Sequence, residues 1–111
     1  MTEDEARQRL ERRASELDEE DRAGADSRAT VTLQQDSVGR LSRMDAMQQQ
    51  AMAQAQERRR EGERRRVAAA LARLDEGEWG WCATCGEEIA EKRLDHDPSA
   101  ATCVSCAAGG G

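Results

Sequence analysis

Residues 82–106 read CATCGEEIAEKRLDHDPSAATCVSC and contain all four cysteines of the 111-residue chain. They form two Cys-x-x-Cys pairs, Cys82 with Cys85 and Cys103 with Cys106, separated by 17 residues. Each pair can direct two thiolates at one metal ion, and two such pairs complete a tetrahedral shell of four sulfurs. The stretch therefore predicts one bound zinc ion with Cys82, Cys85, Cys103 and Cys106 as its ligands.

Two alternatives use the same cysteines without a metal, namely redox-active thiol pairs and disulfides. Disulfides are rare in a reducing cytosol, and the opening residues MTEDEARQRLERR lack the apolar segment of a secretion signal. The sequence has no apolar run of 18 or more residues. We therefore expect a cytoplasmic protein that makes no membrane contact and binds metal. Four sulfurs leave no open coordination position, so the zinc would be structural, and His96 is expected to be a surface residue.

The rest of the chain favours long helices over a wide core, because it has no Phe or Tyr and 36% of its residues are charged. Residues 3–23 predict a first helix with an apolar stripe formed by Ala6, Leu10, Ala14 and Leu17. Residues 24–37 interrupt this pattern, with Gly24 placed to end the first helix. They are expected to form a connector. A long second helix is predicted over 38–76, stopping near Gly77.

These elements predict a mainly α fold, in which an antiparallel two-helix coiled-coil hairpin over 1–77 precedes a small four-cysteine zinc finger over 78–111. The seam of the hairpin would be thin. Its best residues on the second helix are Leu41, Met44, Met52, Val67, Leu71 and Leu74. A metal-bound finger would then staple the two open ends of the hairpin together.

The stretch ERRREGERRR at 57–66 carries six Arg and three Glu, whereas residues 3–22 carry nine acidic and five basic side chains. Opposite charges could support pairing of the two helices, although exposed ion pairs contribute only about 0–1 kcal/mol each. The run has two interpretations, a solvated helix face and a docking face for an acidic partner.

Several residues around the cysteines form a recognisable pattern. Trp79-Gly80-Trp81 leads into the first pair, Ile89 follows Cys85-Gly86, and Arg93-Leu94 and Pro98 precede the second pair. This segment resembles the zinc finger of the DksA/TraR family of bacterial transcription regulators. The likeness covers about a third of the chain. Residues 38–76 match the family's long second helix less specifically. Residues 1–35 match the family only in their general character, with no specific motif.

The resemblance implies a non-enzymatic regulator whose hairpin enters the secondary channel of RNA polymerase, with structural zinc at its base. The family's best-known members carry two Asp three residues apart at the tip, a pair that this sequence lacks. Asp26, Asp36 and Asp45 lie in the region, and Asp36 is the best tip candidate, although it could simply cap the second helix. Arg59 and Arg66 match basic helix positions that dock on the polymerase.

The family often acts together with the alarmone ppGpp, bound between regulator and polymerase. In relatives that bind it, basic residues on the long helix and around the finger hold the nucleotide. Arg59 and Arg66 keep the basic helix positions, which implies one retained phosphate contact, whereas Asp97 and Ala107 stand where those relatives carry basic residues. Replacing two cations by an anion and a methyl group weakens the binding of a multiply charged phosphate. The ppGpp contact is therefore expected to be weak or absent.

Two other functions remain open, a nucleic-acid-binding finger and a coiled-coil adaptor with no role at the polymerase. Against the first, Lys92 and Arg93 are the only Lys or Arg residues in 82–106, beside five acidic residues. Phosphate binding needs a cluster of positive charge, so no direct specific DNA binding is expected. The sequence shows neither a nucleophile–base pair nor an open metal position, and we do not expect an enzyme.

Overall fold

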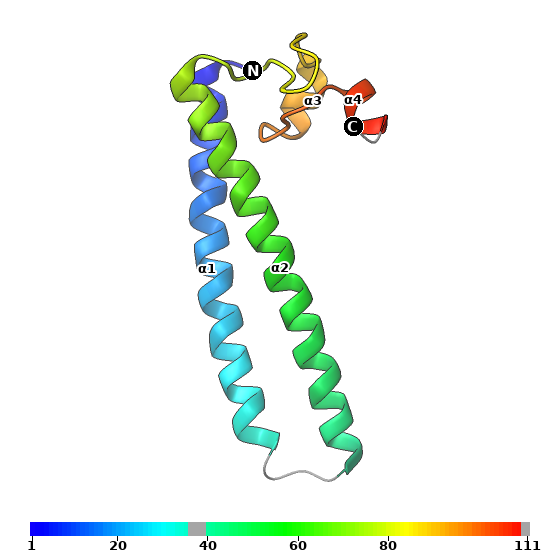
Figure 1. Ribbon diagram of the computed structural model, residues 1–111. Coiled ribbons are helices and arrows are strands. Elements are labelled where there is room, and N and C mark those ends of the chain that lie inside the picture. The colour runs from blue at the N-terminus through cyan, green and yellow to red at the C-terminus, as the bar shows by residue number, and fades with distance from the viewer. Residues whose placement is uncertain (36–39, 110–111) are drawn as a thin grey trace. The chain divides into compact units, whose positions relative to one another are not determined.

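The computed structural model describes the backbone of residues 1–35 and 40–109, and the side chains of residues 1–24 and 43–109. The described chain contains four helices, α1 (Glu3–Gln35), α2 (Arg40–Glu76), α3 (Glu91–His96) and α4 (Val104–Ala108) (Figure 1). Helices α1 and α2 form an antiparallel hairpin, and the two short helices belong to the finger. The predicted mainly α hairpin with a C-terminal four-cysteine finger is confirmed.

The described residues divide into two compact units. Unit 1 contains Met1–Ser15 and Arg64–Gly111, and unit 2 contains Glu16–Glu63. Unit 1 thus combines the two open ends of the hairpin with the finger. Among the described helices, none is both long enough and apolar enough to cross a lipid bilayer.

Unit 1 has an apolar core built from both long helices and the finger. Its buried apolar residues are Ala6, Leu10, Val67, Ala70, Leu74, Trp79, Cys82, Ile89, Leu94 and Ala100. On each helix these residues recur at spacings of three or four, which places them along one face. Complete burial of one large aliphatic side chain contributes about 1.5–3 kcal/mol, and Leu10 is only 1% exposed. The stripe predicted on α1 is confirmed, with Ala14 half-buried.

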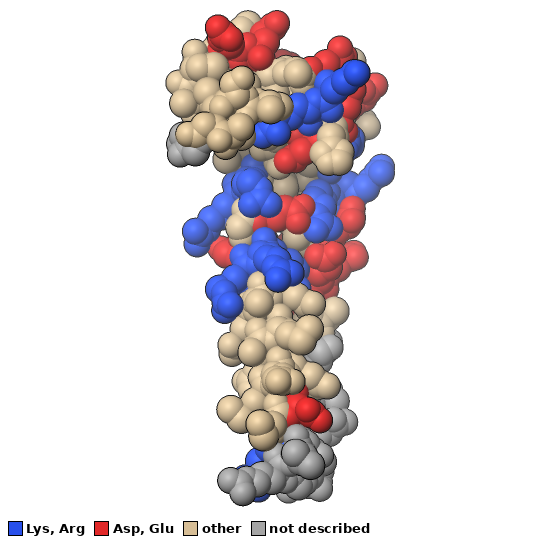
Figure 2. Space-filling view, turned by 90° about the vertical axis from the view of Figure 1, so that its right-hand side faces the viewer, with Lys and Arg blue, Asp and Glu red and all other residues tan. Residues whose placement is uncertain are grey.

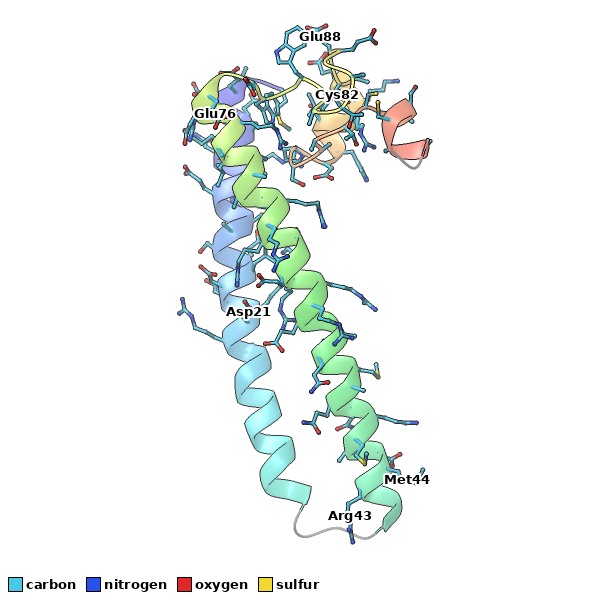
Figure 3. The ribbon with its side chains drawn as sticks, in the orientation of Figure 1. Asp21, Arg43, Met44, Glu76, Cys82 and Glu88 are labelled. Carbon is cyan, nitrogen blue, oxygen red and sulfur yellow. The ribbon has the colours of Figure 1, made fainter. Side chains whose placement is uncertain are left out.

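Unit 2 has a different seam. Steps of seven residues along α2 from Val67 lead to Arg60, Ala53 and Ala46, and all three are half-buried. Arg60 donates a hydrogen bond through Nε to Oδ1 of Asp21 on α1, at 2.7 Å. Figure 3 labels Asp21 beside α2. In unit 2, small and polar side chains therefore occupy the seam positions that correspond to those of Val67 and Leu74 in unit 1.

Two of the residues predicted for the seam do not belong to it. Met44 is 59% exposed and Met52 is 64% exposed. The expectation was wrong because the half-buried positions of α2 follow the seven-residue steps through Ala46 and Ala53, which leave these two methionines on another face. Leu71 is half-buried, and the side chain of Leu41 lies outside the described residues.

The end of α1 also differs from the prediction. The helix continues through Gly24 to Gln35, so the connector predicted to begin at residue 24 was wrong over 24–35. One glycine inside a helix costs only about 1 kcal/mol relative to alanine, and extending an existing helix costs less than starting one because helix formation is cooperative. The predicted connector residues 36 and 37 lie outside the described residues.

The end of α2 confirms the prediction of a stop near Gly77. Gly77 has a φ of 75°, a left-handed conformation that glycine adopts without strain. Its N–H donates to the carbonyl of Leu74 at 3.3 Å, and the N–H of Glu78 donates to that of Arg73 at 2.8 Å. These two bonds form a Schellman motif. The motif turns the chain from α2 into the finger.

Candidate metal centre

The four cysteines converge on one point in unit 1. Their sulfur atoms all lie within 4.8 Å of one another, and the Sγ atoms of Cys85 and Cys103 are 3.8 Å apart. All four are free thiols rather than disulfides. Cys82, labelled in Figure 3, is buried, whereas Cys85 is exposed and Cys103 and Cys106 are half-buried.

The first pair sits in a tight turn. The N–H of Cys82 donates to the carbonyl of Glu87 at 2.7 Å, and the N–H of Gly86 donates to the carbonyl of Cys82 at 2.9 Å. Gly86 has a φ of 78°, so a residue with a Cβ would strain this turn. The N–H of Cys85 points at the sulfur of Cys82, at 3.5 Å. The turn thereby directs both sulfurs of the pair toward the same side.

The second pair is formed by the start of a short helix. Cys103 precedes α4 in extended conformation, and Cys106 lies inside the helix. The N–H of Ala107 donates to the carbonyl of Cys103 at 3.0 Å. A further hydrogen bond, from the N–H of Ala83 to the carbonyl of Ala101 at 2.8 Å, joins the first pair to the segment of chain before the second.

Three side chains hold the segment that leads to the second pair. Trp79 donates through Nε1 to the carbonyl of Pro98 at 2.9 Å, and Arg93 donates through Nε to that of Thr102 at 2.8 Å. Arg73, on α2, lies 3.4 Å from the carbonyl oxygen of Ala100 through Nη2. Trp79 and Arg93 belonged to the recognised pattern, but their partners on this segment could not be derived from spacing, because they depend on the folded loop.

The electrostatics of the four sulfurs suit a bound cation. Hydrogen bonds from the backbone of Cys85 and Cys103 lower the pKa of Cys82 to about 6. In contrast, the neighbouring thiols of Cys103 and Cys82 raise the pKa of Cys106 to about 12. Four thiolates at this spacing repel one another unless a cation lies between them. Zn²⁺ supplies that charge, and a closed four-sulfur shell is the form of its structural sites.

The remaining predicted site residues lie away from the cysteines. Arg59 and Arg66 are exposed on α2, two helical turns apart, and the side chain of Asp45 is also exposed. His96 is exposed and is not part of the described metal cluster, as expected. Asp36, the tip candidate, lies outside the described residues.

Comparison with known proteins identifies the finger. Residues 77–109 match the family model of the prokaryotic dksA/traR C4-type zinc finger. A curated relative, the RNA polymerase-binding transcription factor DksA of Haemophilus influenzae, is 45% identical over 38 residues. That match covers 34% of this chain but only 26% of the relative.

A solved structure extends the likeness to the hairpin at the level of fold. The structure of transcription factor DksA2 from Pseudomonas aeruginosa superposes with a TM-score of 0.81 over 96% of this chain and 80% of that chain. The identity in this comparison is 23%, so it shows the fold alone. The finger match and the four converging thiols together show a zinc finger of the dksA/traR C4 type, with one structural zinc ion as its cofactor.

Proposed function

We propose that this chain is a non-enzymatic transcription regulator that binds RNA polymerase through the enzyme's secondary channel and modulates initiation. The observation that carries the proposal is the combination of a DksA/TraR-type finger with a long antiparallel hairpin. A long two-helix hairpin suits entry into a channel, and the finger belongs to the same compact unit as the two open ends of the hairpin. The curated relative that matches the finger is itself named for RNA polymerase binding.

Co-purification tests the proposal directly. Tagged, zinc-loaded protein is expected to retain the core subunits of bacterial RNA polymerase and to change the lifetime of promoter complexes in transcription with purified components. A protein that retains no polymerase subunit and leaves transcription unchanged would refute the proposal. Retention of other proteins alone would favour the adaptor function, and a salt-dependent gel shift of duplex DNA would favour the nucleic-acid-binding finger.

Asp36 is the proposed tip residue of this regulator. A single carboxylate brought near a catalytic metal ion alters the local field strongly. Asp36→Asn is therefore expected to abolish the effect on transcription while binding to polymerase remains largely intact. Asp45→Asn is the control, because Asp45 is an exposed carboxylate on α2. If Asp36→Asn is silent and Asp45→Asn or Asp26→Asn is not, the tip lies elsewhere.

The proposed docking contacts are Arg59 and Arg66 on α2. Figure 2 shows several basic side chains, with acidic ones among them, across the middle of this face, next to a stretch with little charge. Arg59 and Arg66 are seven residues apart and so share one face of the helix, and both are exposed. Arginine is well suited to carboxylate recognition because its planar fork donates two parallel hydrogen bonds. Substitution of either by Ala should weaken retention of polymerase, whereas Arg12→Ala, an exposed arginine on α1, should not.

The proposed regulator acts with little or no ppGpp synergy at its own interface with polymerase. The Oδ1 atom of Asp97 accepts hydrogen bonds from the backbone and hydroxyl of Ser99, at 3.0 and 2.6 Å, and Ala107 is exposed. A hydrogen bond to a charged group is worth about 1.5–3 kcal/mol, so the absence of two basic partners weakens phosphate binding about a hundredfold or more. Transcription with polymerase that lacks its other ppGpp site tests this. Strong synergy that disappears in Arg66→Ala would contradict it.

A further inference from the structure

Unit 1 contains a cavity of about 460 Å³ whose lining includes none of the four cysteines. Trp79, Ile89 and Leu94 line it, and each of the three is buried, with 8% exposure or less. Trp81, Glu88 and Glu91 line it as well, and all three are exposed. Met1 lines the cavity too. The cavity therefore combines apolar walls with an exposed indole ring, two carboxylates and one amino group, and its volume is in the range of ligand pockets.

Trp81 and Glu88 are the exposed pair of this cavity. They face each other across an antiparallel bridge, and residues directly opposite in such a bridge direct their side chains to the same side. The indole of Trp81 is 48% exposed, the only large aromatic surface open to solvent among the described residues. Figure 3 labels Glu88 and Cys82 in the loop between α2 and α3.

The two carboxylates of the cavity, Glu88 and Glu91, differ in whether they have a hydrogen-bonded partner. Glu91 accepts a hydrogen bond from the amino group of Met1, at 3.0 Å, and that group also lies 3.5 Å from Asp95. Among the described residues, no basic side chain pairs with Glu88. The finger segment 82–106 also carries five acidic residues against two basic ones. Glu88 is thus an available anion in an acidic setting, next to an exposed indole.

These features suit a cation carried on an apolar stem. The face of a tryptophan ring attracts a guanidinium group more strongly than the other aromatic side chains do. A carboxylate beside the ring can accept a charge-assisted hydrogen bond from the same group, and the apolar walls can cover its methylene groups. Arginine is favoured over lysine because its planar guanidinium also stacks on aromatic rings and is less strongly hydrated.

We propose that the Trp81–Glu88 cavity is a docking site for an arginine side chain of the protein to which this chain binds. The inference deepens the proposed function and rests on it, since that protein would be RNA polymerase. It gives the acidic finger a contact separate from the basic face of α2, so that the two surfaces would recognise partner groups of opposite charge.

The experiment uses a minimal probe on the zinc-bound full chain. The peptide acetyl-Gly-Gly-Arg-Gly-Gly-amide is titrated while the indole N–H signal of Trp81 is followed by NMR. The same peptide with citrulline, a neutral isostere of arginine, is the comparison. Trp79 serves as a fold reporter through its hydrogen bond to Pro98. We expect a saturable shift at Trp81 with the arginine peptide and about five-fold weaker binding of the citrulline peptide.

Two matched variants test whether the carboxylate of Glu88 binds the arginine peptide. Glu88→Gln should weaken the arginine peptide about five-fold, whereas Glu87→Gln, the neighbouring exposed acid outside the cavity lining, should leave its affinity unchanged. The proposal is overturned if citrulline and arginine bind equally, if Glu87→Gln weakens binding as much as Glu88→Gln, or if no saturable shift occurs at Trp81. Zinc content and the Trp79 signal confirm that each variant is folded.

A parallel arm with polymerase separates this inference from the proposed function. Glu88→Gln should reduce retention of polymerase relative to Glu87→Gln. Equal retention of the two variants by a polymerase that binds the native chain would overturn the arginine site and leave the proposed function standing. Saturable peptide binding by a chain that retains no polymerase would support the cavity and refute the polymerase as its partner.

Discussion

The two units of the chain share the same two helices but are held by different interactions. Unit 1 buries ten apolar residues and brings four thiols together. In unit 2, within residues 16–24 and 43–63, whose side chains the structure describes, Leu17 is the one buried apolar residue. There the seam consists mainly of alanines and of the Asp21–Arg60 pair.

The difference shows how a chain with few bulky apolar residues can still stabilise a long two-helix hairpin. Apolar burial and a metal site are concentrated where the finger joins both helix ends, and unit 2 depends on helix continuity and polar contacts. A hydrogen-bonded polar pair inside a coiled-coil seam also specifies register, at a cost in stability. Segments with few apolar contacts open more readily than cores, so we expect unit 2 to exchange its amide hydrogens faster than unit 1.

Removing the metal should have the largest effect. Structural zinc contributes about 10 kcal/mol or more in small modules, so Cys82→Ser is expected to release zinc and unfold the finger. Part of the helix signal should remain, because helical hydrogen bonds are local. Zinc analysis and thermal unfolding followed by circular dichroism measure both effects. Ser105→Ala, an exposed position between two cysteines, is the control. A metal-free chain with unchanged thermal stability would contradict the role given to zinc.

Acid should release the same metal. Protons compete with zinc for the thiolates, so zinc affinity must fall as the pH falls. The pKa of Cys106 is raised to about 12 by the neighbouring thiols of Cys103 and Cys82, so this thiol resists deprotonation. Zinc release followed with a chelating dye between neutral and acidic pH should therefore be reversible and should coincide with loss of finger structure. Finger structure that persists after the zinc has left would contradict this coupling.

Core truncation compares the two units with the same substitution. Leu10 in unit 1 and Leu17 in unit 2 are both almost completely buried, at 1% and 0% exposure. Leu10→Ala should lower the free energy of unfolding by about 3 kcal/mol, and Leu17→Ala by about 2 kcal/mol, because a thin seam relaxes around a small void more easily. Urea unfolding measures both, with exposed Gln8→Ala as the control. A larger loss for Leu17→Ala would reverse the comparison.

Polar contacts should have the smallest effects. Arg60→Ala leaves Asp21 half-buried without its 2.7 Å partner and should cost about 1.5 kcal/mol. Arg7→Ala removes the more exposed 2.9 Å pair with Asp75 in unit 1 and should cost less than about 1 kcal/mol. Replacing both Asp21 and Arg60 by Leu should leave stability equal or higher. A clear loss in that double variant would show that the pair stabilises unit 2 more than apolar packing would.

The finger and the helical hairpin could be predicted from the sequence because their signals are local. Cysteine spacing alone indicated one four-sulfur site, and the stripe of Ala6, Leu10 and Leu17 located the face of α1 that is buried. The stop of α2 followed from Gly77. Each of these signals lies within a few residues of the structure that it specifies.

The rest depends on partners distant in sequence. The continuation of α1 to Gln35 opposes the local preference of Gly24. The exposure of Met44 and Met52 could not be predicted from their hydrophobicity, because the less hydrophobic residues Ala46, Ala53 and Arg60 occupy the seam instead. The cavity beside Trp81 and Glu88 arises from a bridge between two residues of the finger loop, which composition does not reveal.

Site-specific photo-cross-linking in a complex with RNA polymerase tests the central claim most directly. A photoreactive amino acid is placed one position at a time over residues 30–45, and at Glu19 as a comparison within unit 2. The account predicts cross-links from 30–45 to polymerase segments that surround the catalytic magnesium, and cross-links from Glu19 to a different part of the channel. Cross-links from 30–45 only to the outer surface of the polymerase would contradict it.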